Sequence, residues 1–212
     1  MAAPKNPSET SEATGSDASE NQGYLELAGH LLIAMPGMID DRFARSVILI
    51  CNHDAEGSMG FVLNQPVESP KFEEILEELK LDDCADQLLK SGRDITVFRG
   101  GPVEQGRGFV LHSLDYSTPA SSRVGDLVAV SATLDALRKL CSNEPPQNAV
   151  MLLGYSGWGP GQLESEIVNN GWLSVPATGQ LIFQTATENQ YDAALAEIGI
   201  DQASLSSSGG SA

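Results

Sequence analysis

The segment from Gly154 to Trp172, GYSGWGPGQLESEIVNNGW, combines a serine, a run of glycines and both tryptophans of the chain. Its first residues resemble the G-x-S-x-G turn that exposes a nucleophilic serine between a strand and a helix in hydrolases. Trp158 stands where the final glycine is required, and all three histidines precede Ser156, which contradicts the hydrolase order. These departures argue against a serine nucleophile in this segment.

The same glycines could instead direct backbone N–H groups at a phosphate, because glycine-rich loops before helices commonly bind anions. No lysine or arginine follows Lys139, and Glu164 and Glu166 occupy the first turn of the helix expected here. If Gly161 is the N-cap, Glu164 falls at position N3 and can accept a hydrogen bond from the cap N–H. The segment therefore predicts a self-capped structural corner made of Gly154, Gly157, Gly159, Gly161 and Glu164.

A thiol and an imidazole lie two residues apart in CNHD, and Cys51 and His53 share one face if this segment is a strand. The pair could act as a nucleophile or supply two metal ligands, but zinc requires four ligands and no second pair has usable spacing. Because Cys51 lies in an apolar run, we interpret it as a core cysteine beside a hydrogen-bonded histidine. The sequence predicts no metal site.

Arg107 and His112 flank a short strand in GGPVEQGRGFVLHS, where the arginine could bind a carboxylate or a phosphate. It could also pair with an acidic residue and hold the loop, and the glycine and proline content favours this structural role. If the glycine corner also binds, the lack of a nearby cation favours a neutral or backbone-rich partner. The candidate binding residues are Arg107, His112, Tyr155, Trp158 and Gln162.

The elements that must position these residues mix hairpins with a strand–helix–strand unit, which indicates an α+β fold. Apolar, β-branched runs predict strands at 30–35, 46–53, 60–64, 95–101, 108–113, 126–130, 149–155, 172–176 and 181–185. Amphipathic spacing predicts helices at 69–81, 133–141 and 188–199. Ser69 and Pro70 suit the start of the first helix, and Leu134 belongs to the apolar stripe of the second. We expect a single domain at 23–203.

The 212-residue chain carries 29 acidic and 12 basic residues, a formal net charge of −17. This acidic surface repels nucleic acids and anionic lipids, so direct nucleic-acid binding is disfavoured. Three cysteines without a C-x-x-C pair indicate a reduced, cytoplasmic protein, and no apolar run is long enough to span a membrane. The polar segments at 1–22 and 204–212 predict a disordered N-terminal tail and a flexible C-terminal tail.

Five blocks of the chain span about residues 25–205. They are LIAMPGM followed by F-x-R-S-V, CNHDAEGSMGFVLNQP, FRGGPVEQGRGFVLH, GYSGWGPGQLESEI continued by NN-x-WL-x-VPA, and L-I-F-x-T. In this order, the blocks resemble the YqgE/AlgH family of bacterial proteins. The resemblance implies a compact domain with a mixed or bifurcated, barrel-like sheet surrounded by helices. It brings no agreed catalytic residues and no cofactor. One member is described as a transcriptional regulator of alginate synthesis, which implies a regulatory role.

The chain departs from this family at several positions. Asp41 stands where a proline is usual, Tyr191 stands where a tryptophan is frequent, and GGSA replaces the usual terminal Gly-His-Ala. Family members often carry alanine where Ser156 stands, which further weakens the serine-nucleophile hypothesis. The resemblance therefore implies an architecture and a regulatory label rather than a reaction.

These observations predict a non-enzymatic regulatory or protein-interaction module in the cytoplasm, which binds an unknown protein partner or small ligand. One alternative is a transcription regulator that binds DNA directly, which the acidic charge and the lack of a basic recognition helix disfavour. A second alternative is an enzyme that uses Cys51 and His53, or Arg107 and His112. The oligomeric state does not follow from the sequence.

Overall fold

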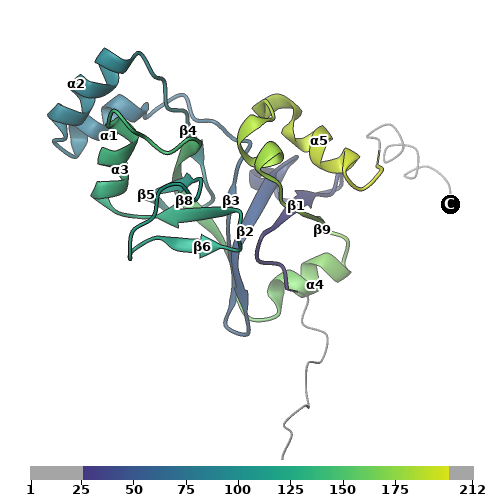
Figure 1. Ribbon diagram of the computed structural model, residues 1–212. Helices are drawn as coiled ribbons and strands as arrows, with labels where there is room; N and C mark the ends of the chain where they lie inside the picture. The colour runs from purple at the N-terminus through teal and green to yellow at the C-terminus, as the bar shows by residue number, and fades with distance from the viewer. Residues whose placement is uncertain (1–25, 201–212) are drawn as a thin grey trace, which may run out of the picture.

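The fold is known from a computed structural model that describes residues 26–200. The predicted tails, and the outer limits of the domain expected at 23–203, lie outside these residues. Figure 1 shows a curled sheet with helices at both ends and along one side. Over the described part of the chain, nine strands form this largely antiparallel half-barrel, and the helices pack around it. The expected α+β class is confirmed.

One half of the sheet has the strand order β9–β1–β2–β3–β8, and all of its neighbours are antiparallel. Its members are β1 (His30–Ala34), β2 (Val47–Asp54), β3 (Gly57–Val62), β8 (Ala149–Trp158) and β9 (Trp172–Pro176). The first half of β2 is buried on both faces, as its continuous apolar run predicts. Alternate side chains enter two different cores, because Val47 and Leu49 face the central core while Ile48 and Ile50 face the opposite side.

The other half of the sheet has the order β6–β7–β5–β8, and β4 pairs in parallel with β8. Its members are β4 (Val97–Arg99), β5 (Val103–His112), β6 (Ser122–Val124) and β7 (Val128–Ser131). Strand β8 belongs to both halves. Its residues 151–153 pair with β4 and β5, and its residues 156–158 pair with β3. The sheet therefore divides along a single long strand.

Gly154 is the residue at which β8 changes partners. Its φ of 70° lies in the left-handed region, and an added Cβ would come within 2.7 Å of the carbonyl oxygens of Gly101 and Val103. The strand predicted to end at Tyr155 continues to Trp158, so the first glycines lie within a strand rather than in a turn. The strand can continue through this position because Gly154 adopts a left-handed backbone conformation without a side-chain clash.

Helices cover three sides of the sheet (Figure 1). Their bounds are α1 (Phe72–Glu78), α2 (Asp82–Ser91), α3 (Leu134–Cys141), α4 (Gln162–Val168) and α5 (Gln190–Ala196), with short helices η1 (Asp41–Phe43), η2 (Gln180–Gln184) and η3 (Thr187–Asn189). The first three pack over β5 and β8, and α5 closes the central core. Helix α4 packs against β3 and β9, next to both tryptophans.

Two predicted elements need correction. The run at 181–185, predicted as a strand, is the π-helix η2, in which the Thr185 N–H donates to the Gln180 carbonyl at 2.9 Å. In place of a neighbouring strand, Gln190 Nε2 donates to the Leu181 carbonyl at 2.7 Å. The first helix, predicted at 69–81, spans 72–78, because Lys71 is its N-cap in an extended conformation and the Lys71 N–H donates to the Glu74 carboxylate at 2.9 Å.

Three further elements, η1, α2 and β6, are not among the predictions. Helix α2 is mostly polar and buries only Cys84 and Leu88. Strand β6 has three residues, too few for a periodic signal. In α3, Leu134 was expected on the buried stripe, but it is 46% exposed because it starts the helix at the edge of the layer.

Candidate functional site

The glycine segment, α4 and the β1–β2 connection enclose a cavity of about 450 Å³, which we call the tryptophan pocket. Stretches that are far apart in the sequence, at 38–43, 102–103 and 157–172, supply its walls. Its apolar surface comes from Met38, Phe43, Pro102, Trp158 and Trp172. Two of the candidate binding residues, Trp158 and Gln162, therefore line one cavity.

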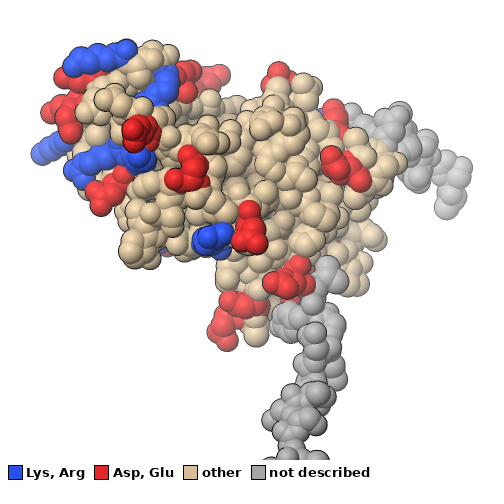
Figure 2. All heavy atoms as spheres, in the orientation of Figure 1, with Lys and Arg blue, Asp and Glu red and all other residues tan. Residues whose placement is uncertain are grey.

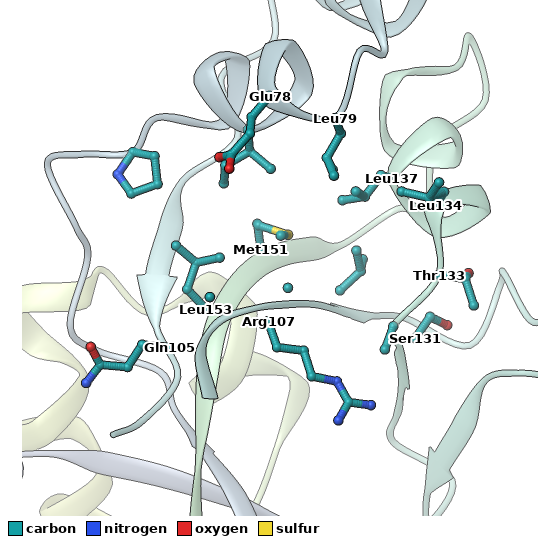
Figure 3. Close-up of a pocket in the computed structure, with 16 residues that line it drawn as sticks. Glu78, Leu79, Gln105, Arg107, Ser131, Thr133, Leu134, Leu137, Met151 and Leu153 are labelled. Atoms are coloured by element: carbon teal, nitrogen blue, oxygen red, sulfur yellow. The ribbon is translucent and has the colours of Figure 1, made fainter. Parts of the chain in front are cut away.

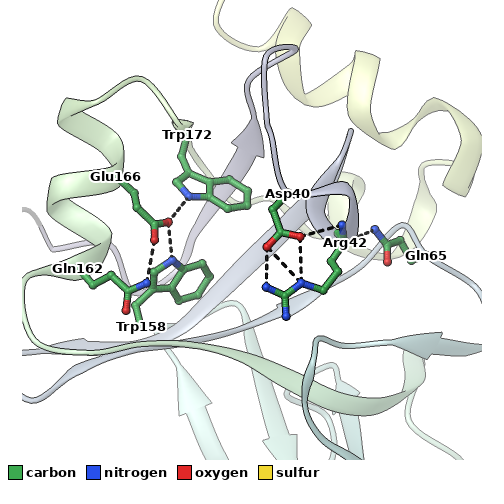
Figure 4. Close-up of polar contacts among 7 residues, drawn as sticks. All are labelled: Asp40, Arg42, Gln65, Trp158, Gln162, Glu166 and Trp172. Atoms are coloured by element: carbon green, nitrogen blue, oxygen red, sulfur yellow. Dashed lines mark hydrogen bonds and ion pairs between the residues drawn. The ribbon is translucent and has the colours of Figure 1, made fainter.

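Glu166 binds both indoles of the pocket through one carboxylate oxygen (Figure 4). The Nε1–H groups of Trp158 and Trp172 donate to Oε2 of Glu166 at 2.9 and 2.8 Å. The other oxygen, Oε1, accepts from Nε2 of Gln162 at 2.8 Å. Hydrogen bonds to an ionised group are stronger than neutral ones, so this carboxylate holds the orientation of both rings.

The start of α4 links the glycine turn to this carboxylate. Gln162 and Glu166 lie four residues apart on one helix face, and Oε1 of Gln162 also accepts from the Gly159 N–H at 3.0 Å. Gly161 is the N-cap, with a φ of 70°. The described hydrogen bonds do not include the expected one from the Gly161 N–H to Glu164, whose Oε1 lies 3.7 Å from Nε2 of His53.

The aromatic rings of the pocket pack edge to face. The Trp172 ring centroid lies 5.7 Å from that of Phe43 and 6.1 Å from that of Trp158, with interplanar angles of 73° and 82°. This is the arrangement that aromatic quadrupoles favour. Trp158 and Trp172 are only 7% and 3% exposed, so they form the floor of the pocket rather than its rim.

A charged pair lies at the edge of the pocket (Figure 4). Asp40 caps η1 by accepting from the Arg42 N–H at 3.0 Å, and its Oδ2 lies 2.6 Å from the Arg42 guanidinium. Hydrogen bonds from Arg42 hold the pKa of Asp40 below its usual range, so the pair stays ionised. Gln65 Nε2 donates to the Arg42 carbonyl at 3.0 Å and anchors the loop. The Arg42 side chain is 65% exposed and can reach a partner.

Two other candidate residues, Arg107 and Tyr155, do not line the tryptophan pocket. Arg107 lies where the pairing of β5 with β8 is irregular, donates to Glu104 at 3.0 Å and stacks 5.0 Å from the Phe109 ring centroid. Tyr155 is half-buried and contacts the same Phe109 ring, at a centroid distance of 6.1 Å. These two residues meet on Phe109, and the contacts of Arg107 are those of a structural side chain.

His112, the last candidate binding residue, is fully buried. Its Nδ1 donates to the carbonyl of Ser113 at 3.0 Å, and its Nε2 lies 2.9 Å from the Ser131 hydroxyl. Ser131 in turn lies 2.8 Å from the Ser121 hydroxyl. The structure thus places His112 in a hydrogen-bonded core network, away from the tryptophan pocket.

The candidate nucleophiles are fully or partly buried. Ser156 is fully buried, and its hydroxyl donates to the Gly100 carbonyl at 3.4 Å. The Cys51 thiol contacts the Leu49 carbonyl at 3.8 Å, and burial raises the pKa of Cys51 to about 12. His53 Nδ1 lies 2.7 Å from the Ser58 hydroxyl. At neutral pH, Cys51 is therefore a thiol rather than a reactive thiolate.

Residues 26–200 lack both a cluster of metal ligands and a helix that could span a membrane. No group of three or more histidine, cysteine or acidic side chains there is placed to hold a metal ion. In the same range, no helix has both the length and the apolar character that crossing a bilayer requires.

Several residues of the pocket are not among the candidate binding residues that the sequence indicates: Met38, Asp40, Arg42, Phe43, Glu166 and Trp172. One available signal was the four-residue spacing of Gln162 and Glu166, which places an amide and a carboxylate on one helix face. A second signal was the position of the two tryptophans, one on each side of α4. No local pattern connects the Asp40 loop to them.

Comparisons with known proteins agree with the fold and the motifs. The AlgH-like family DUF179 matches residues 31–203. A UPF0301 protein of Allorhizobium ampelinum is 50% identical over 199 residues, which cover 92% of this chain and 96% of the relative. A UPF0301 protein of Agrobacterium fabrum is 50% identical over 183 residues, which cover 85% of this chain and 90% of the relative.

Two solved structures share the fold. The solution structure of AlgH from Pseudomonas aeruginosa has a TM-score of 0.70 and 34% identity, covering 92% of this chain and 100% of AlgH. A crystal structure from Corynebacterium diphtheriae has a TM-score of 0.63 at 19% identity, covering 81% and 87% of the two chains, and supports the fold alone. The family match covers most of the chain, and relatives with about half of their residues identical align with almost all of it. This chain therefore belongs to the AlgH-like family.

Proposed function

We propose that this protein is a non-enzymatic regulatory module that binds a protein partner through the tryptophan pocket. The main support is that three segments far apart in the sequence, at 38–43, 102–103 and 157–172, together form one aromatic cavity. Protein interfaces are enriched in tryptophan, methionine and arginine, and a few aromatic anchors commonly dominate their affinity. Trp158, Trp172, Met38 and Arg42 supply these residue types here.

Exposed apolar side chains beside the pocket support partner binding. Ile39 is 96% exposed and lies between Met38 and Asp40, both of which line the pocket. Val168 is 80% exposed and precedes Asn169, another residue of the lining. Burying such apolar surface in an interface gains roughly 25 cal/mol for each Å². An apolar side chain of the partner enters the pocket, and Ile39 and Val168 contact the surrounding surface.

The polar groups of the pocket are bonded to one another, which supports binding rather than catalysis. Glu166 accepts three hydrogen bonds, and Asp40 is paired with Arg42. As far as the described residues show, the pocket lining contains no histidine, cysteine, serine or lysine. These residue types supply many nucleophiles and general bases, and the two carboxylates of the lining, Asp40 and Glu166, are already hydrogen-bonded within the pocket. The raised pKa of Cys51 weighs against the thiol enzyme alternative.

Regulation of transcription through a protein partner fits the surface charge better than direct DNA binding does. Figure 2 shows lysine and arginine gathered over the end of the molecule that carries α1 to α3. The segments 71–94 and 134–141 carry six basic residues, but also nine acidic ones, so no uniformly basic surface results. Three free cysteines are consistent with work in the reducing cytoplasm.

Affinity capture with surface variants tests the proposal. Ile39→Asp places a charge at the pocket, and Leu89→Asp places the same charge on α2, where Leu89 is 73% exposed and outside the pocket. The wild-type protein and the Leu89→Asp variant retain the partner, and Ile39→Asp loses it. Identical partners for all three proteins refute the proposed site. Specific retardation of promoter DNA at low salt, absent with random DNA, supports the DNA-binding alternative instead.

A further inference from the structure

A second cavity, of about 510 Å³, lies between α1, the start of α3 and the outer face of β5 and β8 (Figure 3). We call it the α1–α3 groove. Its floor is apolar and consists of Val110, Leu137, Met151 and Leu153. A volume of this size falls within the range of roughly 300–1,000 Å³ that accommodates a ligand. The groove shares no residue with the tryptophan pocket.

The walls of the groove expose two leucines. Leu79, at the end of α1, is 42% exposed, and Leu134, at the start of α3, is 46% exposed. Both side chains project toward the groove from opposite helices (Figure 3). Among the described residues, only five large apolar side chains are exposed, so finding two of them across one cavity indicates a surface that another molecule covers.

The charged residues at the rim indicate the charge of the ligand that the groove binds. Glu78, from α1, lines the groove, and none of the ion pairs found among residues 26–200 involves it. Arg107 also lines the groove, but its guanidinium is paired with Glu104 and points away from the apolar side chains (Figure 3). The rim therefore offers an unpaired negative charge beside an apolar floor, which suits a cationic and apolar ligand.

We propose that the α1–α3 groove docks a basic amphipathic helix of a partner protein. The apolar face of that helix lies between Leu79 and Leu134, and a lysine or arginine pairs with Glu78. A helix suits this groove because it places apolar side chains every three or four residues on one face, which can lie on the apolar floor between α1 and α3. The net charge of −17 favours a basic partner and opposes pairing with a second copy of this chain.

A synthetic helical peptide provides the probe, with leucine at positions i, i+3, i+4 and i+7 and lysine at exposed positions. A matched peptide carries glutamate in place of lysine. Fluorescence anisotropy measures the binding of each peptide to the full-length protein and to Leu79→Glu, Leu134→Glu and Leu89→Glu. Leu89 is 73% exposed but lies outside the groove, so its variant is the control. Circular dichroism establishes that each variant is folded.

The lysine peptide binds the wild-type protein, and Leu79→Glu and Leu134→Glu each weaken binding by roughly tenfold or more. Leu89→Glu does not weaken it. Since all three variants add one negative charge, non-specific attraction would strengthen binding in every case, and only docking in the groove gives a loss. Glu78→Gln weakens binding by about two- to fivefold, whereas Glu77→Gln, at an exposed position outside the groove lining, leaves it unchanged.

Three results overturn the inference. The first is that the lysine peptide does not bind, and the second is that the glutamate peptide binds as tightly as the lysine peptide. The third is that Leu79→Glu and Leu134→Glu bind the lysine peptide with the same affinity as Leu89→Glu. Self-association of the wild type that Leu79→Glu abolishes also overturns it, because the groove would then hold a second copy. A variant of the tryptophan pocket, Ile39→Asp, retains peptide binding. Failure of one proposed site is therefore distinguishable from failure of the other.

Discussion

Trp158 and Trp172 donate their indole N–H groups to the same oxygen of Glu166, at 2.9 and 2.8 Å. Trp158 ends β8, Trp172 begins β9, and Glu166 lies on the helix that connects these strands. One carboxylate thus joins the two ends of a strand–helix–strand unit. The tryptophan pocket owes its shape to this contact.

Glu166→Gln is expected to destabilise the protein by about 1–3 kcal/mol. A neutral amide is a weaker acceptor for two indole N–H groups, and its own NH₂ group competes for the site. Urea denaturation measures the loss, and tryptophan fluorescence reports the altered environment of the rings. Glu77→Gln, on the exposed face of α1, is the control and should stay within about 0.5 kcal/mol of wild type. Equal stabilities of the two variants would contradict a clamping role for Glu166.

Gly154→Ala is expected to cost more than about 4 kcal/mol, because it combines a left-handed φ with a clash against two carbonyl oxygens at 2.7 Å. Gly161→Ala is the matched control, since Gly161 has the same φ of 70° but no atom within 4 Å of an added Cβ. Its cost is the backbone conformation alone, about 1–2 kcal/mol. Thermal melts compare the two variants, and similar melting temperatures would show that β8 tolerates a side chain at its bend.

Two thiols with raised pKa values, the partly buried Cys51 and the buried Cys141, should make stability fall at alkaline pH. Burial raises the pKa of Cys51 and of Cys141 from the ordinary value of 9.0 to about 12 in the folded protein. A raised folded-state pKa favours folding below pH 9, and this contribution is lost as the pH rises from about 9 to about 12. Urea denaturation across this range measures the loss, and Cys51→Ala should reduce it. A wild-type stability that does not change between pH 9 and 12 would refute the prediction.

Alkylation provides a second measure of the same thiols. At pH 7 the native protein should react slowly with iodoacetamide at Cys51 and Cys141, because the thiolate is the reactive species. Unfolding in urea should accelerate labelling at both positions. Rapid labelling of native Cys51 below pH 7 would instead revive the thiol enzyme alternative.

Tyr191→Phe should destabilise the protein by about 1 kcal/mol. The buried Tyr191 hydroxyl donates to the Ala34 carbonyl at 2.7 Å and ties α5 to β1. Tyr116→Phe is the matched control, because the described contacts include no hydrogen bond of the Tyr116 hydroxyl. Chemical denaturation measures the free energy of unfolding of both variants. Equal losses of stability would show that the Tyr191 hydrogen bond does not stabilise the protein.

Local patterns along the chain are sufficient to predict the elements whose partners lie nearby in the sequence and those that are buried along their whole length. The apolar run at 46–53 predicted β2 because both of its faces enter cores, and the spacing at 133–141 predicted α3. Only the tertiary structure could correct 181–185, since a short apolar run satisfies a strand or a helix equally well. In the structure, Gln190 supplies the partner that a neighbouring strand would have supplied.

The sequence by itself determined the α+β class, the acidic surface, the AlgH-like motifs and the pairing of Trp158 with Gln162 as candidate binding residues. The tertiary structure alone decided that Glu166 joins both tryptophans, that the Asp40–Arg42 loop completes the pocket, and that His112 is buried. The physical reason is that periodicity reports which residues share a face of one element. The contact between Phe43 and Trp172 depends on the pairing of β1 with β9, which no local spacing encodes.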